Sequence, residues 1–99
     1  MRTISVEQLK DKLQAGETLN IVDVRTDEEV ALGMIRGAIH IPVDQIPNRI
    51  DELNKGEHYY LTCRTNNRSG NAYLFLEDKG YDVTLVDGGM TAWQALDNE

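Results

Sequence analysis

The stretch YYLTCRTNNRSG, residues 59–70, joins an apolar segment typical of a strand to a segment typical of a helix through a short polar loop. The chain's only cysteine, Cys63, stands where this strand is expected to end. A strand, a tight loop and a helix in this order point backbone N–H groups and a helix N-terminus at one place, where they stabilise an anion. A thiolate is such an anion, so we predict that Cys63 is a nucleophile at neutral pH.

The rest of the chain shows alternating strand-like and helix-like hydrophobic patterns. Strands are predicted at residues 19–24, 38–41, 58–62 and 82–86. Because strands joined by crossovers of helix length run parallel, we predict an α/β fold with a mostly parallel sheet of about five strands and helices on both faces. Ligands bind such sheets beyond the carboxyl ends of the strands, and Cys63 is placed at one of those ends.

Local signals mark where several helices begin and end. Ser5 with Gln8, and Thr26 with Glu29, have the spacing of capping boxes, in which each residue of the pair satisfies a backbone N–H of the other. Gly80 stands where a left-handed residue is expected to end the helix that follows the cysteine loop. The sequence therefore predicts one helix after residue 5, a short one after residue 26, and one that ends just before residue 80.

Size and composition indicate a single domain over residues 1–99. The chain has 99 residues, of which 40% are hydrophobic and 27% charged, which is typical of a globular domain with one core. It has no stretch of roughly 18 consecutive apolar residues, and no apolar signal segment follows Met1. A lone cysteine suits a reducing compartment, so a cytoplasmic location is expected.

Net charge sets expectations about partners and about the site. The value of −7 argues against nucleic acid and against an anionic membrane surface. Against this background we expect a local basic pocket from four arginines near the ends of strands: Arg25, Arg36, Arg64 and Arg68. Asp23 and Arg25 are interpreted as a structural ion pair, and the acidic run 27–29 as a solvent-facing part of its helix.

Four motifs are spread over nearly the whole chain: DVR (23–25), GMIRGAIHIP (33–42), CRTNNRS (63–69) and DGGMTAW (87–93). In this order and at these spacings they resemble the rhodanese family of sulfurtransferases. The resemblance implies a rhodanese-like domain in which Cys63 takes a sulfane sulfur from a donor such as thiosulfate. It also implies that the sulfur passes, as a persulfide, to a thiophilic acceptor such as cyanide, a thiol or a sulfur-accepting protein.

The loop after the cysteine is expected to bind the small anionic donor. Its predicted substrate-binding residues are Arg64, Thr65, Asn66, Asn67, Arg68 and Ser69. Arg68 would add a full positive charge at the helix N-terminus, and Ser69 is either a cap or a hydrogen-bond partner of the sulfur. Asn66 stands where the family commonly has glycine, so we expect a left-handed backbone there, which asparagine tolerates.

Two other functions use the same features. A cysteine phosphatase or arsenate reductase also needs a thiolate and an arginine. However, four residues separate Cys63 from Arg68, one fewer than in the cysteine phosphatases that rhodaneses resemble. The shorter loop favours transfer of sulfur over hydrolysis of a phosphate. A non-catalytic redox-sensing or docking module is the third hypothesis. No metal or cofactor is predicted, since His40 and His58 lack ligand spacing with the single cysteine.

Overall fold

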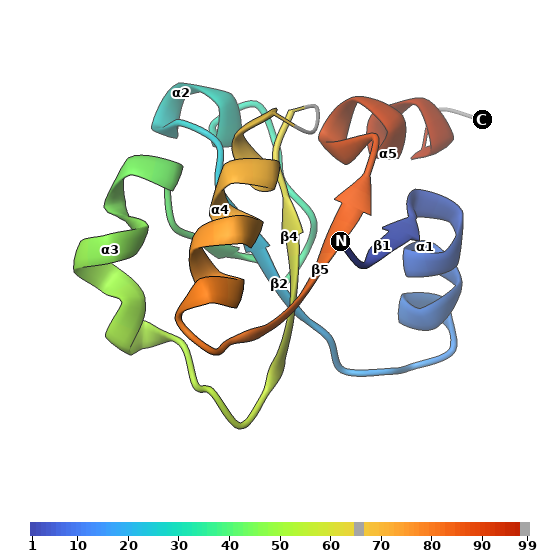
Figure 1. The fold of residues 1–99 in the computed structure, drawn as a ribbon. Coiled ribbons are helices and arrows are strands. Elements are labelled where there is room, and N and C mark those ends of the chain that lie inside the picture. The colour runs from blue at the N-terminus through green and yellow to red at the C-terminus, as the bar shows by residue number, and fades with distance from the viewer. Residues whose placement is uncertain (65–66, 98–99) are drawn as a thin grey trace.

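The computed structural model describes residues 1–64 and 67–97, and within these ranges it gives only the backbone of Asn67 and Asp97. In this part of the chain a five-stranded sheet has the order β1-β5-β4-β2-β3, and all of its recorded pairings are parallel (Figure 1). The strands are β1 (Thr3–Ser5), β2 (Asn20–Asp23), β3 (Ile39–His40), β4 (His58–Thr62) and β5 (Asp82–Asp87). The predicted α/β class and parallel sheet are confirmed.

Helices cover both faces of this sheet (Figure 1). The α-helices are α1 (Val6–Gln14), α2 (Asp27–Val30), α3 (Ile46–Arg49), α4 (Asn67–Asp78) and α5 (Gly89–Asp97), and the 3₁₀ turns are η1 (Val43–Gln45) and η2 (Ile50–Glu52). Helices α1 and α5 pack against each other over one face, while α3 and α4 lie over the other. Within the described ranges no helix has the length and apolar character that crossing a membrane requires.

Each face of the sheet has its own buried cluster. Ile21 of β2 belongs to the cluster beneath α1 and α5, whereas its neighbour Val22 belongs to the cluster beneath α4. Successive side chains of a strand point to opposite faces, so a strand between two helical layers is apolar at consecutive positions. Cys63, just after β4, is part of the cluster beneath α4.

The predicted helix signals are confirmed. The N–H of Gln8 donates to Ser5 Oγ at 3.0 Å, and the N–H of Ser5 donates to Gln8 Oε1 at 3.1 Å. Thr26 and Glu29 make the same reciprocal pair at the start of α2. Gly80, with a φ of 91°, follows the end of α4, and only glycine adopts that backbone freely.

Strand β1 was not indicated by the sequence pattern. Its central residue, Ile4, pairs in register with Val86 of β5 and is buried. Three residues are too few to show a period of two, so only pairing with β5 reveals the strand.

The carboxyl ends of the central strands meet at one edge of the sheet. Val22 lies beside Leu61, and Leu61 lies beside Leu85, so β2, β4 and β5 run in step. Helix α2 and the first turns of α4 and α5 gather at this edge, where β4 ends (Figure 1).

Candidate active site

Cys63 follows the last residue of β4 and lies beneath the start of α4. Cys63 is only 1% exposed, and its Sγ accepts a hydrogen bond from the backbone N–H of Ser69 at 3.3 Å. The Sγ also lies 3.2 Å from the Ser69 hydroxyl, and Ser69 is fully buried. Because the first N–H groups of a helix have no intrahelical acceptor, the sulfur occupies a position that favours negative charge.

Helix α5 holds the backbone of the cysteine loop from the other side. The N–H of Met90 donates to the carbonyl of Cys63 at 2.6 Å. The N–H and the hydroxyl of Thr91 both donate to the carbonyl of Arg64, at 3.0 and 2.8 Å. Cys63 is therefore fixed between the N-terminal turns of two helices.

Arg68 forms an ion pair with Glu29 of α2. Its Nη2 donates to Glu29 Oε2 at 2.7 Å, and its Nη1 donates to Oε1. The side chains are 31% and 24% exposed. The hydrogen bond from Arg68 is the largest cause that lowers the pKa of Glu29, to about 2, and the same bond is the main cause that raises the pKa of Arg68. Both groups are therefore charged at neutral pH.

This ion pair corrects two expectations. We expected Arg68 to add a full positive charge for the anionic donor, yet within the protein the carboxylate of Glu29 balances that charge. We also interpreted Glu29 as solvent-facing, and that was wrong. The two residues are distant in sequence, but the capping box with Thr26 places Glu29 just beyond β2, at the same sheet edge as the loop after β4. That placement was the signal available from the sequence.

Asp23 and Arg25 form the predicted structural ion pair. Both are buried, at 0% and 4% exposure, and the Nη2 of Arg25 lies 2.7 Å from Asp23 Oδ2. The same guanidinium donates to the carbonyls of Gly33 at 2.7 Å and of Glu29 at 3.4 Å. Arg25 therefore ties the segment that contains α2 to the end of β2.

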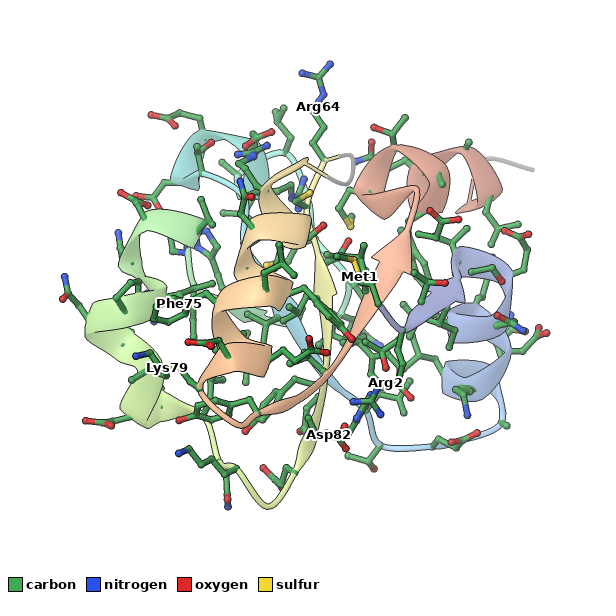
Figure 2. The ribbon with its side chains drawn as sticks, viewed as in Figure 1. Met1, Arg2, Arg64, Phe75, Lys79 and Asp82 are labelled. Carbon is green, nitrogen blue, oxygen red and sulfur yellow. The ribbon has the colours of Figure 1, made fainter. Side chains whose placement is uncertain are left out.

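The predicted basic pocket carries less positive charge than expected. Arg25 and Arg68 are paired with carboxylates, and Arg36 is exposed. Arg64 extends away from the body of the protein (Figure 2), and in the described part of the chain it has no ion-pair partner. A pocket of about 300 Å³ opens beside the loop, with Glu29, Arg64 and Met90 among the residues that line it.

Comparison with known proteins identifies the family. Residues 5–96 match the model of the rhodanese-like domain. The chain belongs to this family. A protein of Allochromatium vinosum named sulfurtransferase is 37% identical over 91 residues, which cover 91% of this chain and 85% of that protein. YtwF of Bacillus subtilis is 43% identical over 94 residues, which cover 95% of this chain and 91% of that protein.

Solved structures agree with this assignment. The crystal structure of a rhodanese-like domain protein from Staphylococcus aureus superimposes with a TM-score of 0.90 at 45% identity. That likeness covers 94% of this chain and 91% of the other. The fold of this rhodanese-like domain is therefore established along with its family.

Part of the predicted substrate loop lies outside the described residues. Thr65 and Asn66 are not described, and for Asn67 only the backbone, which begins α4, is described. Their predicted roles, and the left-handed backbone expected at Asn66, therefore stay predictions. Of the other predicted binding residues, Ser69 contacts the sulfur, Arg68 contacts Glu29, and Arg64 contributes its carbonyl to the contact with α5.

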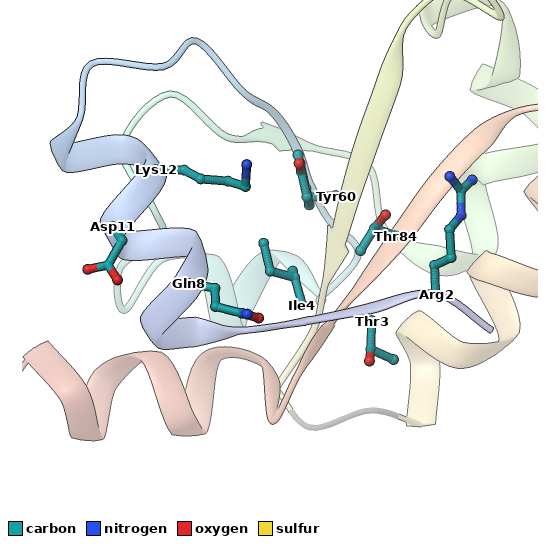
Figure 3. A pocket seen from close by; sticks show the side chains of 8 residues that line it. All are labelled: Arg2, Thr3, Ile4, Gln8, Asp11, Lys12, Tyr60 and Thr84. Atoms are coloured by element: carbon teal, nitrogen blue, oxygen red, sulfur yellow. The ribbon is translucent and has the colours of Figure 1, made fainter.

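A second hollow of the rhodanese-like domain lies elsewhere. It has a volume of about 560 Å³ and is found between α1 and the strands, where Lys12 points toward Tyr60 (Figure 3). None of the described residues of the cysteine loop is among those that line it. Next to Thr84, both ring nitrogens of His58 are engaged: Nδ1 lies 2.8 Å from Asp82 Oδ2, and Nε2 lies 2.7 Å from Thr84 Oγ1.

Side chains that could bind a metal ion do not cluster in the described part of the chain. Among residues 1–64 and 67–97, no group of three or more His, Cys, Asp or Glu side chains is arranged to hold a metal ion.

Proposed function

We propose that this rhodanese-like domain is a sulfurtransferase that moves a sulfane sulfur from a donor such as thiosulfate to cyanide or a thiol, through a persulfide on Cys63. The observation that carries the proposal is the hydrogen bond from the Ser69 N–H to the Cys63 Sγ at 3.3 Å. It is supported by the family and by the relative named sulfurtransferase.

The reaction consists of two displacements at sulfur. The Cys63 thiolate attacks the outer sulfur of thiosulfate, an S–S bond forms to Sγ, and sulfite leaves with the electron pair of the broken S–S bond. Cyanide or a thiolate then attacks the outer sulfur of the persulfide, and Cys63 leaves as the thiolate. No electrons enter or leave beyond those of donor and acceptor, so no redox cofactor is required.

Each surrounding group has a role that follows from its position. The Ser69 N–H and the dipole of α4 stabilise negative charge on the sulfur, both before attack and after sulfur leaves. The contacts of Met90 and Thr91 hold the loop carbonyls, which fixes the direction of the loop N–H groups. In the proposal the backbone from Arg64 to Ser69 forms the cradle for the transferred sulfur.

The proposal extends to partners and location. The acceptor is a small thiophile or a sulfur-accepting protein, and the domain acts in the cytoplasm as one unit over residues 1–99. Cys63 is nearly fully buried, and the pocket lined by Arg64 and Met90 opens beside its loop, so the proposal has the acceptor approach the outer sulfur from that pocket.

Steady-state turnover tests this proposal against its alternatives. Wild type and Cys63→Ser are assayed for thiocyanate formation from thiosulfate and cyanide, and for hydrolysis of an aryl phosphate. The proposal expects thiocyanate from the wild type only and no phosphate release from either protein. Hydrolysis of the aryl phosphate without thiocyanate would establish the phosphatase alternative instead. Absence of both activities would support the non-catalytic module.

A further inference from the structure

The Glu29–Arg68 ion pair determines the charge that a sulfur donor meets. Arg68 uses both terminal nitrogens of its guanidinium on the two oxygens of Glu29. Glu29 also lines the pocket that opens beside the cysteine loop. An anionic donor that needs the charge of Arg68 therefore has to compete with a carboxylate that is already bound to it.

Glu29 is held in place independently of Arg68. Its Oε1 accepts hydrogen bonds from the N–H and the hydroxyl of Thr26, both at 3.0 Å. Its carbonyl is bound by Arg25, which is itself fixed by the buried carboxylate of Asp23. Rotation of the Glu29 side chain away from Arg68 would break the reciprocal cap of α2, so the carboxylate stays near the loop.

Thiosulfate and an organic persulfide differ in the negative charge that this site has to accommodate. Thiosulfate carries two negative charges, whereas the S–S–H group of a persulfide carries at most one. At short range in a partly buried site, a second negative charge that no unpaired cation balances raises the free energy of a dianion above that of a monoanion. Arg25 and Arg68 are both paired, and Arg64, which lines the pocket without an ion-pair partner among the described residues, extends away from the body of the protein. The described site therefore favours the donor of lower charge.

We infer that Glu29 determines the donor class: by neutralising Arg68, it makes this domain accept sulfur from organic persulfides in preference to thiosulfate. This inference rests on the proposed function of Cys63. The Cys63 thiolate attacks the outer sulfur of R–S–S–H, a bond forms from Sγ to that sulfur, and the S–S bond of the donor breaks. The thiolate R–S⁻ leaves with the electron pair, so charge and atoms balance. Glu29 acts through Arg68 and is thus a positioning residue.

The substitution Glu29→Gln tests the inference with little disturbance of α2. Glutamine serves at the third position of a capping box as glutamate does, so the cap with Thr26 is preserved while the charge is removed. The control is Glu28→Gln, which removes the same charge from an exposed neighbour on the same helix. Donors are thiosulfate and the persulfide of 2-mercaptoethanol, which has no other ionised group. The acceptor is cyanide.

In Glu29→Gln we expect the KM for thiosulfate to fall about tenfold, which corresponds to about 1.4 kcal/mol, with little change in kcat. The KM for the persulfide should change less than about twofold, and Glu28→Gln should match the wild type with both donors. Combining Glu29→Gln with Arg68→Gln should remove the gain, because the charge that binds thiosulfate is then absent.

Two results would overturn the inference while leaving sulfur transfer intact. One is a wild-type kcat/KM higher for thiosulfate than for the persulfide, and the other is a ratio of the two that Glu29→Gln leaves unchanged. If Glu29→Gln does not fold, Arg68→Gln alone replaces it, and the ratio of thiosulfate to persulfide kcat/KM must then fall because Glu29 is left unpaired. Wild-type inactivity with both donors would instead refute the proposed function itself.

Discussion

The Sγ of Cys63 and the hydroxyl of Ser69 lie 3.2 Å apart, and the N–H of the same serine donates to that sulfur at 3.3 Å. One residue of α4 thus offers the sulfur both a backbone and a side-chain contact. Both residues are almost fully buried, where polar contacts are stronger than in water. In the proposed mechanism both contacts stabilise negative charge on the sulfur.

Replacing the hydroxyl separates its contribution from that of the backbone. Ser69→Ala keeps the N–H but removes the Oγ, so we expect kcat/KM for sulfur transfer to fall roughly threefold to tenfold, the effect of one hydrogen bond. Thermal unfolding of the variant serves as the control for structural damage. If folded Ser69→Ala has the same kcat/KM as the wild type, the backbone N–H is sufficient and the hydroxyl does not contribute to sulfur transfer.

Asn66 tests the geometry assumed for the cysteine loop. Asn66→Gly should keep or raise the activity, because glycine adopts a left-handed backbone without cost. Asn66→Val should lower it, because a β-branched residue resists positive φ. The comparison is made on kcat/KM with one donor. Full activity in the valine variant would contradict a left-handed cradle at this position.

The buried pair between Asp23 and Arg25 should contribute strongly to stability. Asp23→Ala leaves a guanidinium inside the protein without its carboxylate, and such changes cost about 3–5 kcal/mol in the free energy of unfolding. As a control, Glu52→Ala removes the partner of Arg49 on the surface, where a much smaller loss of stability is expected. Urea unfolding measures both, and similar losses in the two variants would contradict this account.

The Glu29–Arg68 pair makes a pH-dependent contribution to stability. Folding lowers the pKa of Glu29 from 4.5 to about 2, so the folded state favours the ionised carboxylate. The stabilisation is fully present above the unfolded pKa and is lost as the pH falls through the folded one. The difference in free energy of unfolding between wild type and Glu29→Gln should therefore shrink between about pH 5 and pH 2. A constant difference over that range would contradict the assignment.

Local signals predicted the parts of the fold that local chemistry decides. The capping boxes at Ser5 and Thr26 act within one turn, and the strand before Cys63 has a continuous apolar pattern. Strand β1 was not predicted because its three residues become a strand only through pairing with β5, which is distant in sequence.

Charge pairing at the site was harder to predict than its elements. The pair between Asp23 and Arg25 is two residues apart in sequence and was predicted correctly. The partner of Arg68 depends on how β2 and β4 lie side by side, which brings α2 to the cysteine loop. A sequence pattern shows which carboxylates exist near helix starts, but the sheet order decides which of them reaches an arginine.

The intact mass of the protein after incubation with a sulfane sulfur donor tests the central claim most directly. Wild type should gain the mass of one sulfur atom, excess thiol should reverse the gain, and Cys63→Ser should show none. Thiosulfate and the persulfide of 2-mercaptoethanol are both used, so that a weak donor is not mistaken for an inert cysteine. A wild-type mass that neither donor changes, or an equal gain in Cys63→Ser, would contradict a persulfide on Cys63.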